Sequence, residues 1–209
     1  FFIQGLLDLY EASFDPVCLQ CAQRLSAIMI DLFWDDSGGG FYLTAQDAEQ
    51  LLFRPKEVYD GAIPSGNSVA ALDLVRLYHI TLAEDLRAKY EKLFAAFSAE
   101  VSENPAAYAQ MLSALDFAWG PSCEIVLAGE KDDPQMTAIT RKIYEYFIPN
   151  KVVILRPASG NAAPILNIAP FASGQTAIGG KPAVYVCVGH TCQQPVREMA
   201  QLQESLRQL

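Results

Sequence analysis

The segment from Pro64 to Leu82 most constrains how this chain can fold, because it predicts a helix that is apolar on nearly every face. The start signal PSGNS is followed by VAALDLVRLYHITL, in which only Asp73, Arg76 and His79 interrupt the apolar pattern. These three residues share one narrow stripe of the helix. A helix with so little polar surface belongs in the interior of a helical domain. We expect His79 to be buried there and satisfied by hydrogen bonds.

Other helices precede and follow this segment. Asp15 and Pro16 are a typical N-cap and first helical residue. The apolar residues after them fall at helical spacing, which predicts one buried face through Cys18, Cys21, Leu25, Ile28 and Leu32. We therefore predict that Cys18 and Cys21 pack in the core and do not form a redox or zinc motif. Further helices are predicted near the start of the chain and at residues 15–34, 83–101 and 105–119.

The pattern changes at Pro121, where we place a domain boundary. Residues 121–209 predict strands at 124–129 and 151–155 with a helix between them, which is a βαβ unit with parallel strands. A third strand at 183–188 and a closing helix at 195–206 follow. The predicted fold class is mainly α, with antiparallel helical hairpins over residues 1–120 and a small α/β unit over 121–209.

Composition excludes several classes of protein. With 51% apolar and 19% charged residues among 209, the chain is neither disordered nor collagen-like. A net charge of −9 argues against nucleic acid as the main partner, and no apolar run is long enough to span a membrane. Five cysteines leave at least one unpaired within the chain, which favours a cytoplasmic location. No nucleotide-binding motif or metal-ligand spacing is present, so we expect no cofactor and no metal.

Residues 38–67 form a long connection with little helical pattern. Long irregular segments in compact domains are often functional. This one contains aromatic residues, alternating charges and the GGG triplet at 38–40, which suits an ordered loop that lines a cavity.

This loop also resembles a known family. The pieces GGGFY, R-x-K-E, DGA and PSGNS follow one another within Gly38–Tyr78, and AVYVCVGHTCQQPV stands at Ala183–Val196. Together they are similar to the C-terminal part of the thioredoxin-domain proteins related to spermatogenesis-associated protein 20. Members of that family combine an N-terminal thioredoxin-like domain with an (α/α)6 toroid like that of six-hairpin glycosidases and sugar 2-epimerases.

The resemblance implies that this chain is a fragment containing the last helical hairpins of such a toroid. The exposed edges of that arc would contact the N-terminal part of the same protein or a second copy of the chain. It also implies a cleft that binds a small carbohydrate-like ligand, with glycosidase- or epimerase-like chemistry as one outcome. A non-catalytic scaffold for the thioredoxin-like domain is the first alternative.

The candidate site residues lie in the long loop and at the start of the apolar helix. Glu57 and Asp60 are the candidate acid/base pair of a glycosidase-like reaction. The alternative is an internal network in which Arg54 and Lys56 neutralise these two carboxylates. The residues predicted to bind the ligand, by stacking or by hydrogen bonds, are Phe41, Tyr42, Arg54, Lys56, Tyr59, Ser65 and Asn67. For Ser65 and Asn67 helix capping is the alternative to ligand binding.

Cys187 and Cys192 are the redox candidates, and a thiol redox element is the second alternative function. The strand at 183–188 ends in a turn through Gly189, His190 and Thr191. Cys192 beside His190 predicts either a reactive thiol or a disulfide with Cys187. Packing as small apolar residues is the other interpretation of both cysteines.

Overall fold

The computed structural model describes residues 1–49, 51–189 and 191–209. They form two compact units. The helical unit contains residues 1–10, 17–78 and 83–119, and the α/β unit contains residues 11–16, 79–82 and 120–209. Over the described residues the fold is mainly α with a small α/β part, as the sequence predicts. Among them no helix has both the length and the apolar character needed to cross a membrane.

The helical unit is assembled around α3 (Gly66–Thr81). Nearly every residue of this helix is buried, including the polar Asp73 and Arg76, which confirms that it is an interior helix. Tyr78 of α3 meets the ring of Tyr90 edge-to-face, and Arg76 pairs with Asp8 at 2.6 Å. The helices of this unit are α1 (Phe2–Ser13), α2 (Pro16–Phe33), α4 (Glu84–Ala96), α5 (Ser98–Glu103) and α6 (Ala109–Trp119), with a short 3-10 turn η1 (Pro105–Ala107).

Two details of the helical unit differ from the sequence prediction. The buried face of α2 passes through Leu19, Ala22 and Ser26, whereas Cys21 and Ile28 of the predicted face are exposed. The predicted helix over 83–101 is divided at Phe97, which leaves helical geometry with φ −114° and ψ 11°. The Phe97 ring fills the space next to Gly40, where even a Cβ atom would come within 2.8 Å of it. The packing of the Phe97 ring beside Gly40 accompanies the break between α4 and α5.

The α/β unit has a four-stranded sheet in the order β2-β1-β3-β4. The central strand β1 (Cys123–Ala128) pairs in parallel with β2 (Lys151–Arg156) after the crossover helix α7 (Pro134–Tyr144), which confirms the predicted βαβ unit. On its other side β1 pairs antiparallel with β3 (Ala183–Val188), which pairs with the two-residue strand β4 (Thr191–Cys192). The remaining helices are α8 (Ala163–Leu166), a 3-10 helix η2 (Pro170–Gly174) and the closing helix α9 (Met199–Arg207).

Successive side chains along each strand point to opposite faces of the sheet. One face packs on α7 and α9 and forms an apolar core with Ile125, Leu127, Ile143, Val186 and Leu202 among its members. The opposite face presents Glu124, whose Oε1 lies 2.8 Å from Nδ1 of His79. Both side chains are buried, so His79 is a hydrogen-bonded interior residue as expected.

Candidate functional site

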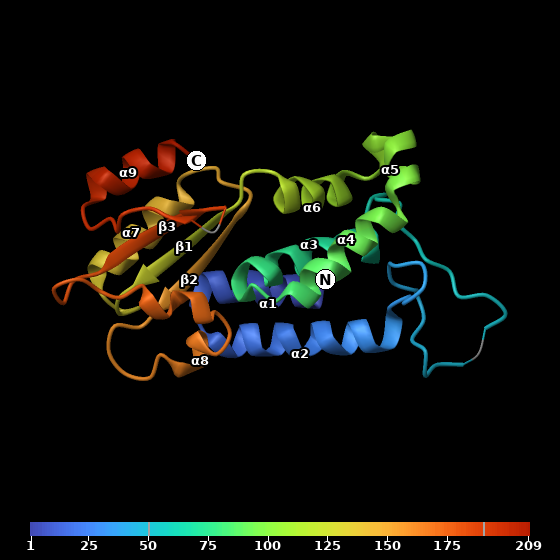
Figure 1. The fold of residues 1–209 in the computed structure, drawn as a ribbon, viewed down its shortest axis with the longest axis horizontal. Helices are drawn as coiled ribbons and strands as arrows, with labels where there is room; N and C mark the ends of the chain where they lie inside the picture. The colour runs from blue at the N-terminus through green and yellow to red at the C-terminus, as the bar shows by residue number, and fades with distance from the viewer. Residues whose placement is uncertain (50, 190) are drawn as a thin grey trace. The chain divides into compact units, whose positions relative to one another are not determined.

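The segment between α2 and α3 extends beyond the ends of the helices as one long loop (Figure 1). It contains no helix or strand in its described part, and a single bridge between Trp34 and Phe41 closes its first turn. Backbone hydrogen bonds hold its two arms together, with Leu43 donating to Pro55, and hold its end to η1, with Asp60 donating to Ala107. The loop is therefore an ordered part of the helical unit.

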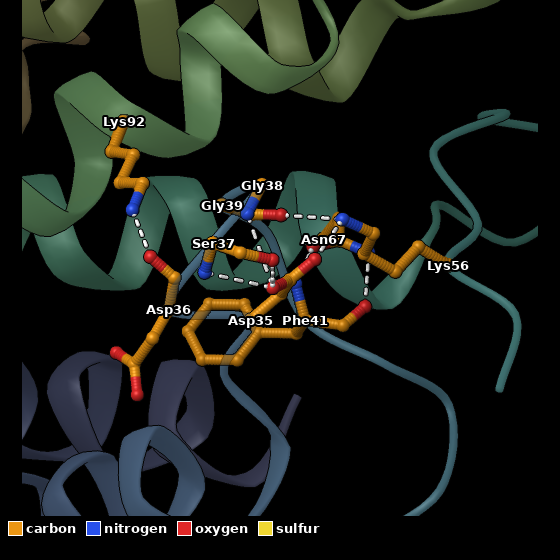
Figure 2. A network of polar contacts seen from close by, with 9 residues as sticks. All are labelled: Asp35, Asp36, Ser37, Gly38, Gly39, Phe41, Lys56, Asn67 and Lys92. Carbon is orange, nitrogen blue, oxygen red and sulfur yellow. Dashed lines mark hydrogen bonds and ion pairs between the residues drawn. The ribbon is translucent and has the colours of Figure 1, made fainter.

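The side chain of Asn67 joins α3 to both arms of this loop. Its Oδ1 accepts from the Phe41 amide at 2.7 Å, and its Nδ2 donates to the carbonyl of Phe41 at 2.9 Å (Figure 2). Nδ2 also donates to the carbonyl of Glu57 at 2.8 Å. Asn67 is 2% exposed, so these bonds form in a nearly water-free site. Ser65 caps α3 by accepting from the Ser68 amide at 3.0 Å. Both side chains of the PSGNS motif that were ligand candidates make internal bonds.

Asp35 is the centre of a second polar cluster at the start of the loop (Figure 2). Its carboxylate accepts from the amides of Ser37 and Gly38 and from the Ser37 hydroxyl. Lys56 Nζ lies 2.7 Å from Asp35 Oδ2 and also donates to the carbonyl of Gly39 at 2.8 Å. These donors, Lys56 first among them, hold the pKa of Asp35 well below its usual range.

Gly39 and Gly40 make this cluster possible. Both have left-handed backbone angles, with φ of +77° and +76°. A Cβ on Gly39 would lie 2.7 Å from the backbone carbonyl oxygen of Lys92, which cannot move aside. The triplet thus brings the chain against α4, where Lys92 Nζ donates to the carbonyl of Asp36.

Two cations lie close to the ring of Tyr42. The Arg54 guanidinium carbon lies 4.1 Å from the ring centroid, and Lys56 Nζ lies 5.4 Å from it. Next to the ring is a cavity of about 730 Å³, which we call the Tyr42 cavity. Its lining residues are Tyr42, Leu51, Leu52, Phe53, Arg54, Lys56, Ala96, Phe97 and Glu100. The structure thus brings Tyr42, Arg54 and Lys56 of the predicted site into one cavity.

The other predicted site residues are not among those that line this cavity. Phe41 is 5% exposed and its ring packs edge-to-face on Trp34 with the centroids 5.0 Å apart. Tyr59 and Glu57 are exposed, and the Glu57 side chain makes no ion pair or hydrogen bond with any residue the structure describes. The acid/base pairing of Glu57 with Asp60 is not tested by these positions and stays a prediction.

Asp60 joins the starts of two helices. Its Oδ1 accepts from the Ser65 amide at 2.9 Å, and its Oδ2 accepts from the amides of Gln110 at 2.9 Å and Met111 at 3.1 Å. These amides belong to the residue before α3 and to the first turn of α6, so the carboxylate caps α6 from a distant part of the sequence. Its partners are backbone amides rather than Arg54 or Lys56.

Sequence reasoning missed Asp35 and Glu124 of the interior, and it named Asp73 without assigning it a role. Asp35 could have been found, because Asp followed by Ser-Gly is a common turn sequence in which the carboxylate accepts from the next amides. Burial raises the pKa of Asp73 in α3 to about 7, and Asp73 Oδ1 makes no hydrogen bond within the described residues. Glu124 had no signal, since it lies within an otherwise apolar strand.

In the α/β unit, Cys187 and Cys192 form a disulfide across the β3–β4 pair. Cys187 is buried and Cys192 is exposed. Gln175 Nε2 lies 3.1 Å from the sulfur of Cys192 and 3.5 Å from that of Cys187. The predicted role of His190 concerns a residue outside the described ones. Cys18, Cys21 and Cys123 are free thiols. In the described part of the chain no three His, Cys, Asp or Glu side chains are grouped closely enough to hold a metal ion.

Comparison with known proteins shows similarity along the whole chain. Spermatogenesis-associated protein 20 of Rattus norvegicus is 35% identical over 210 residues, which cover 100% of this chain. The human protein of that name is 35% identical over 208 residues, covering 99%, and an uncharacterized protein of Caenorhabditis elegans is 31% identical over 208 residues, covering 98%. The chain is homologous to the C-terminal part of spermatogenesis-associated protein 20.

This homology confirms the resemblance carried by the Gly38–Tyr78 motifs. The chain spans about a quarter of the length of these relatives, 26% of the rat and human spermatogenesis-associated protein 20 and 27% of the nematode protein. No protein-family model matches the chain.

Asp35 gives the protein a predictable response to acid. Its pKa is lower in the folded state than in the unfolded chain, so its stabilising contribution is complete above about pH 4 and is lost as the pH falls further. We expect Asp35→Asn to lower the free energy of unfolding at pH 7 by about 2 kcal/mol. The deficit should shrink in urea titrations at pH 3.

Asp36→Asn is the matched control, because its carboxylate is 93% exposed and lies 3.6 Å from Lys89. This change should alter stability by less than about 0.5 kcal/mol at either pH. Equal stability of the two variants at pH 7, or a deficit for Asp35→Asn that is the same at both pH values, would contradict the assignment.

Proposed function

We propose that the Tyr42 cavity binds a small carbohydrate-like ligand. The observation that supports this is the convergence of Tyr42, Arg54 and Lys56 on one cavity of about 730 Å³. That volume lies within the range of small-molecule sites, about 300–1,000 Å³. Aromatic rings offer a flat surface for the C–H face of a sugar, and the cations and Glu100 offer partners for its hydroxyl groups.

The proposal concerns binding rather than turnover. Both oxygens of Asp60 already accept backbone hydrogen bonds, and protonating this carboxylate would weaken the cap of α6. A general acid must gain and lose a proton in each cycle. Glu57 is exposed, and its side chain does not line the Tyr42 cavity. We therefore assign Asp60 a positioning role in the loop and assign no catalytic step to either residue.

The helical unit is proposed to form part of an (α/α)6 toroid, with the rest of the longer protein supplying the other helices and a thioredoxin-like domain. What supports this proposal is that the chain matches only about a quarter of the length of its longer relatives. Large apolar side chains are exposed on α1 and α2, among them Phe2, Leu9 and Ile28, and such side chains are suited to contact further helices or a second copy of the chain. The helical unit would then also serve as a scaffold. Binding experiments are for this reason best made on the full-length protein.

A panel of neutral sugars tests the ligand proposal. We expect at least one of glucose, mannose and N-acetylglucosamine to bind the full-length protein in calorimetric titrations. Tyr42→Ala should weaken that binding by about tenfold, because aromatic contacts contribute about 0.5–1.5 kcal/mol each. Phe147→Ala removes a 94% exposed ring from the α/β unit and should leave the affinity unchanged. Absence of binding by every sugar tested, neutral or anionic, or equal effects of the two substitutions, would overturn the proposal.

A second candidate function is thiol–disulfide exchange at Cys187–Cys192, favoured by the exposure of residue Cys192. In the proposed step a thiolate of an external dithiol attacks Cys192 Sγ, the disulfide breaks, and Cys187 leaves as a thiolate that takes up a proton. The second thiol of the reagent then attacks the mixed disulfide. The reagent leaves oxidised to its disulfide, and Cys192 is released as a thiol.

Counting alkylated cysteines tests this candidate. In denaturant the chain should take three labels without reductant and five after the native protein has been treated with a mild dithiol. Cys192→Ser should take four labels in both cases, because it leaves Cys187 without its partner. Five labels before reduction, or three after it, would exclude the exchange.

A further inference from the structure

Arg54 is the one cation of the Tyr42 cavity whose charge is not balanced by a carboxylate among residues 1–49, 51–189 and 191–209. Lys56, the other cation, forms an ion pair with Asp35 at 2.7 Å. The Arg54 guanidinium instead donates to the carbonyl of Thr44 at 2.5 Å and stacks over Tyr42. No carboxylate oxygen of the described residues lies within ion-pair distance of it. One full positive charge therefore faces the cavity.

The guanidinium also has spare donors. Arg54 Nε is buried and makes no hydrogen bond within the described chain. Of the outer nitrogens of the guanidinium only Nη2 donates a hydrogen bond within the described chain, so the N–H groups of Nη1 are left for an acceptor on a ligand. The planar fork of an arginine matches the two oxygens of a carboxylate or phosphate. Its stacking on Tyr42 and its bond to Thr44 hold the fork in place before a ligand arrives.

Glu100 is the acidic residue that lines the same cavity. It lies in the first turn of α5 and is exposed, so water and salt weaken its field. Arg54 is half-buried, and its interaction with a bound group is less weakened. Glu100 consequently reduces the attraction of an anion to the cavity without cancelling it.

From these contacts we infer that the Tyr42 cavity selects sugars that carry an oxyanion, a carboxylate or a phosphate, which pairs with the guanidinium of Arg54. This inference rests on the proposed carbohydrate binding and specifies its ligand class. Leu51, Leu52 and Phe53 also line the cavity beside Arg54, and all three are exposed in the described chain.

Calorimetric titration of the full-length protein with three related ligands tests this inference. Glucuronate has the carboxylate, glucose 6-phosphate has the phosphate, and glucose has neither. At least one anionic sugar should bind about tenfold more tightly than glucose, because hydrogen bonds to charged groups contribute about 1.5–3 kcal/mol. The stronger of the two anionic ligands identifies which oxyanion the cavity prefers.

Two substitutions in the cavity should act in opposite directions. Arg54→Gln should remove the preference for the anionic sugar, whereas Glu100→Gln should strengthen it by about twofold to threefold. A gain of affinity cannot arise from loss of folding, so the second variant keeps the test valid if the first is destabilised. Arg24→Gln removes an exposed cation of α2 outside the cavity and should change neither affinity.

Distinct failures identify which claim is wrong. If glucose binds as tightly as both anionic sugars, or if Arg54→Gln leaves their ratio unchanged, the anion preference is overturned while carbohydrate binding stands. If none of these sugars nor any of the neutral panel binds, the carbohydrate proposal fails and this inference fails with it.

Discussion

The side-chain amide of Asn67 is the contact on which the rest of the helical unit depends. Three hydrogen bonds from one buried group join the first turn of α3 to Phe41 and Glu57, which lie in different arms of a long loop. Ordering a loop of this length costs about 1–2 kcal/mol per residue in backbone entropy. The hydrogen bonds of Asn67 offset part of this entropy cost. The Asp35–Lys56 ion pair and the hydrogen bonds of Asp60 hold the loop at two further positions.

The charged residues of this loop and of the Tyr42 cavity fall into two groups with different consequences. Asp35, Lys56 and Asp60 make buried or half-buried bonds to one another or to backbone amides, and such groups hold a structure together. Arg54 and Glu100 line the cavity without a carboxylate or cation partner in the described chain, and these are the groups that a ligand can use. The separation places structural ion pairs beside the cavity in which we propose that a ligand binds.

Sequence reasoning succeeded where the signal is local. The burial of α3 follows from its composition, and β1, α7 and β2 follow from a strand–helix–strand pattern with a proline at the helix start. It failed where a tertiary contact decides, as at Phe97, which interrupts a regular helix to fill the space beside Gly40. The buried face of α2 was predicted one residue away from Leu19, Ala22 and Ser26, because two neighbouring stripes of that helix are similarly apolar.

The candidate site shows the same division. Spacing in a loop does not determine which carboxylate meets which cation, and the alternative network of Arg54 and Lys56 with Glu57 and Asp60 does not form among the described residues. Lys56 pairs with Asp35, a residue 21 positions earlier in the chain, and Asp60 binds backbone amides. The pairing of Cys187 with Cys192 was one of the options left open, and it depends on the register of β3 and β4.

Hydrogen exchange of the loop amides tests most directly that the Asn67 contacts order this segment. The amide of Phe41 donates to Asn67, that of Leu43 to Pro55 and that of Asp60 to Ala107. We predict that all three exchange at least about a hundredfold more slowly than the amide of Leu52, which has no hydrogen-bond acceptor in the described chain. Exchange of Phe41 at the rate of Leu52 would show that the loop is not held, and would contradict this account of the site.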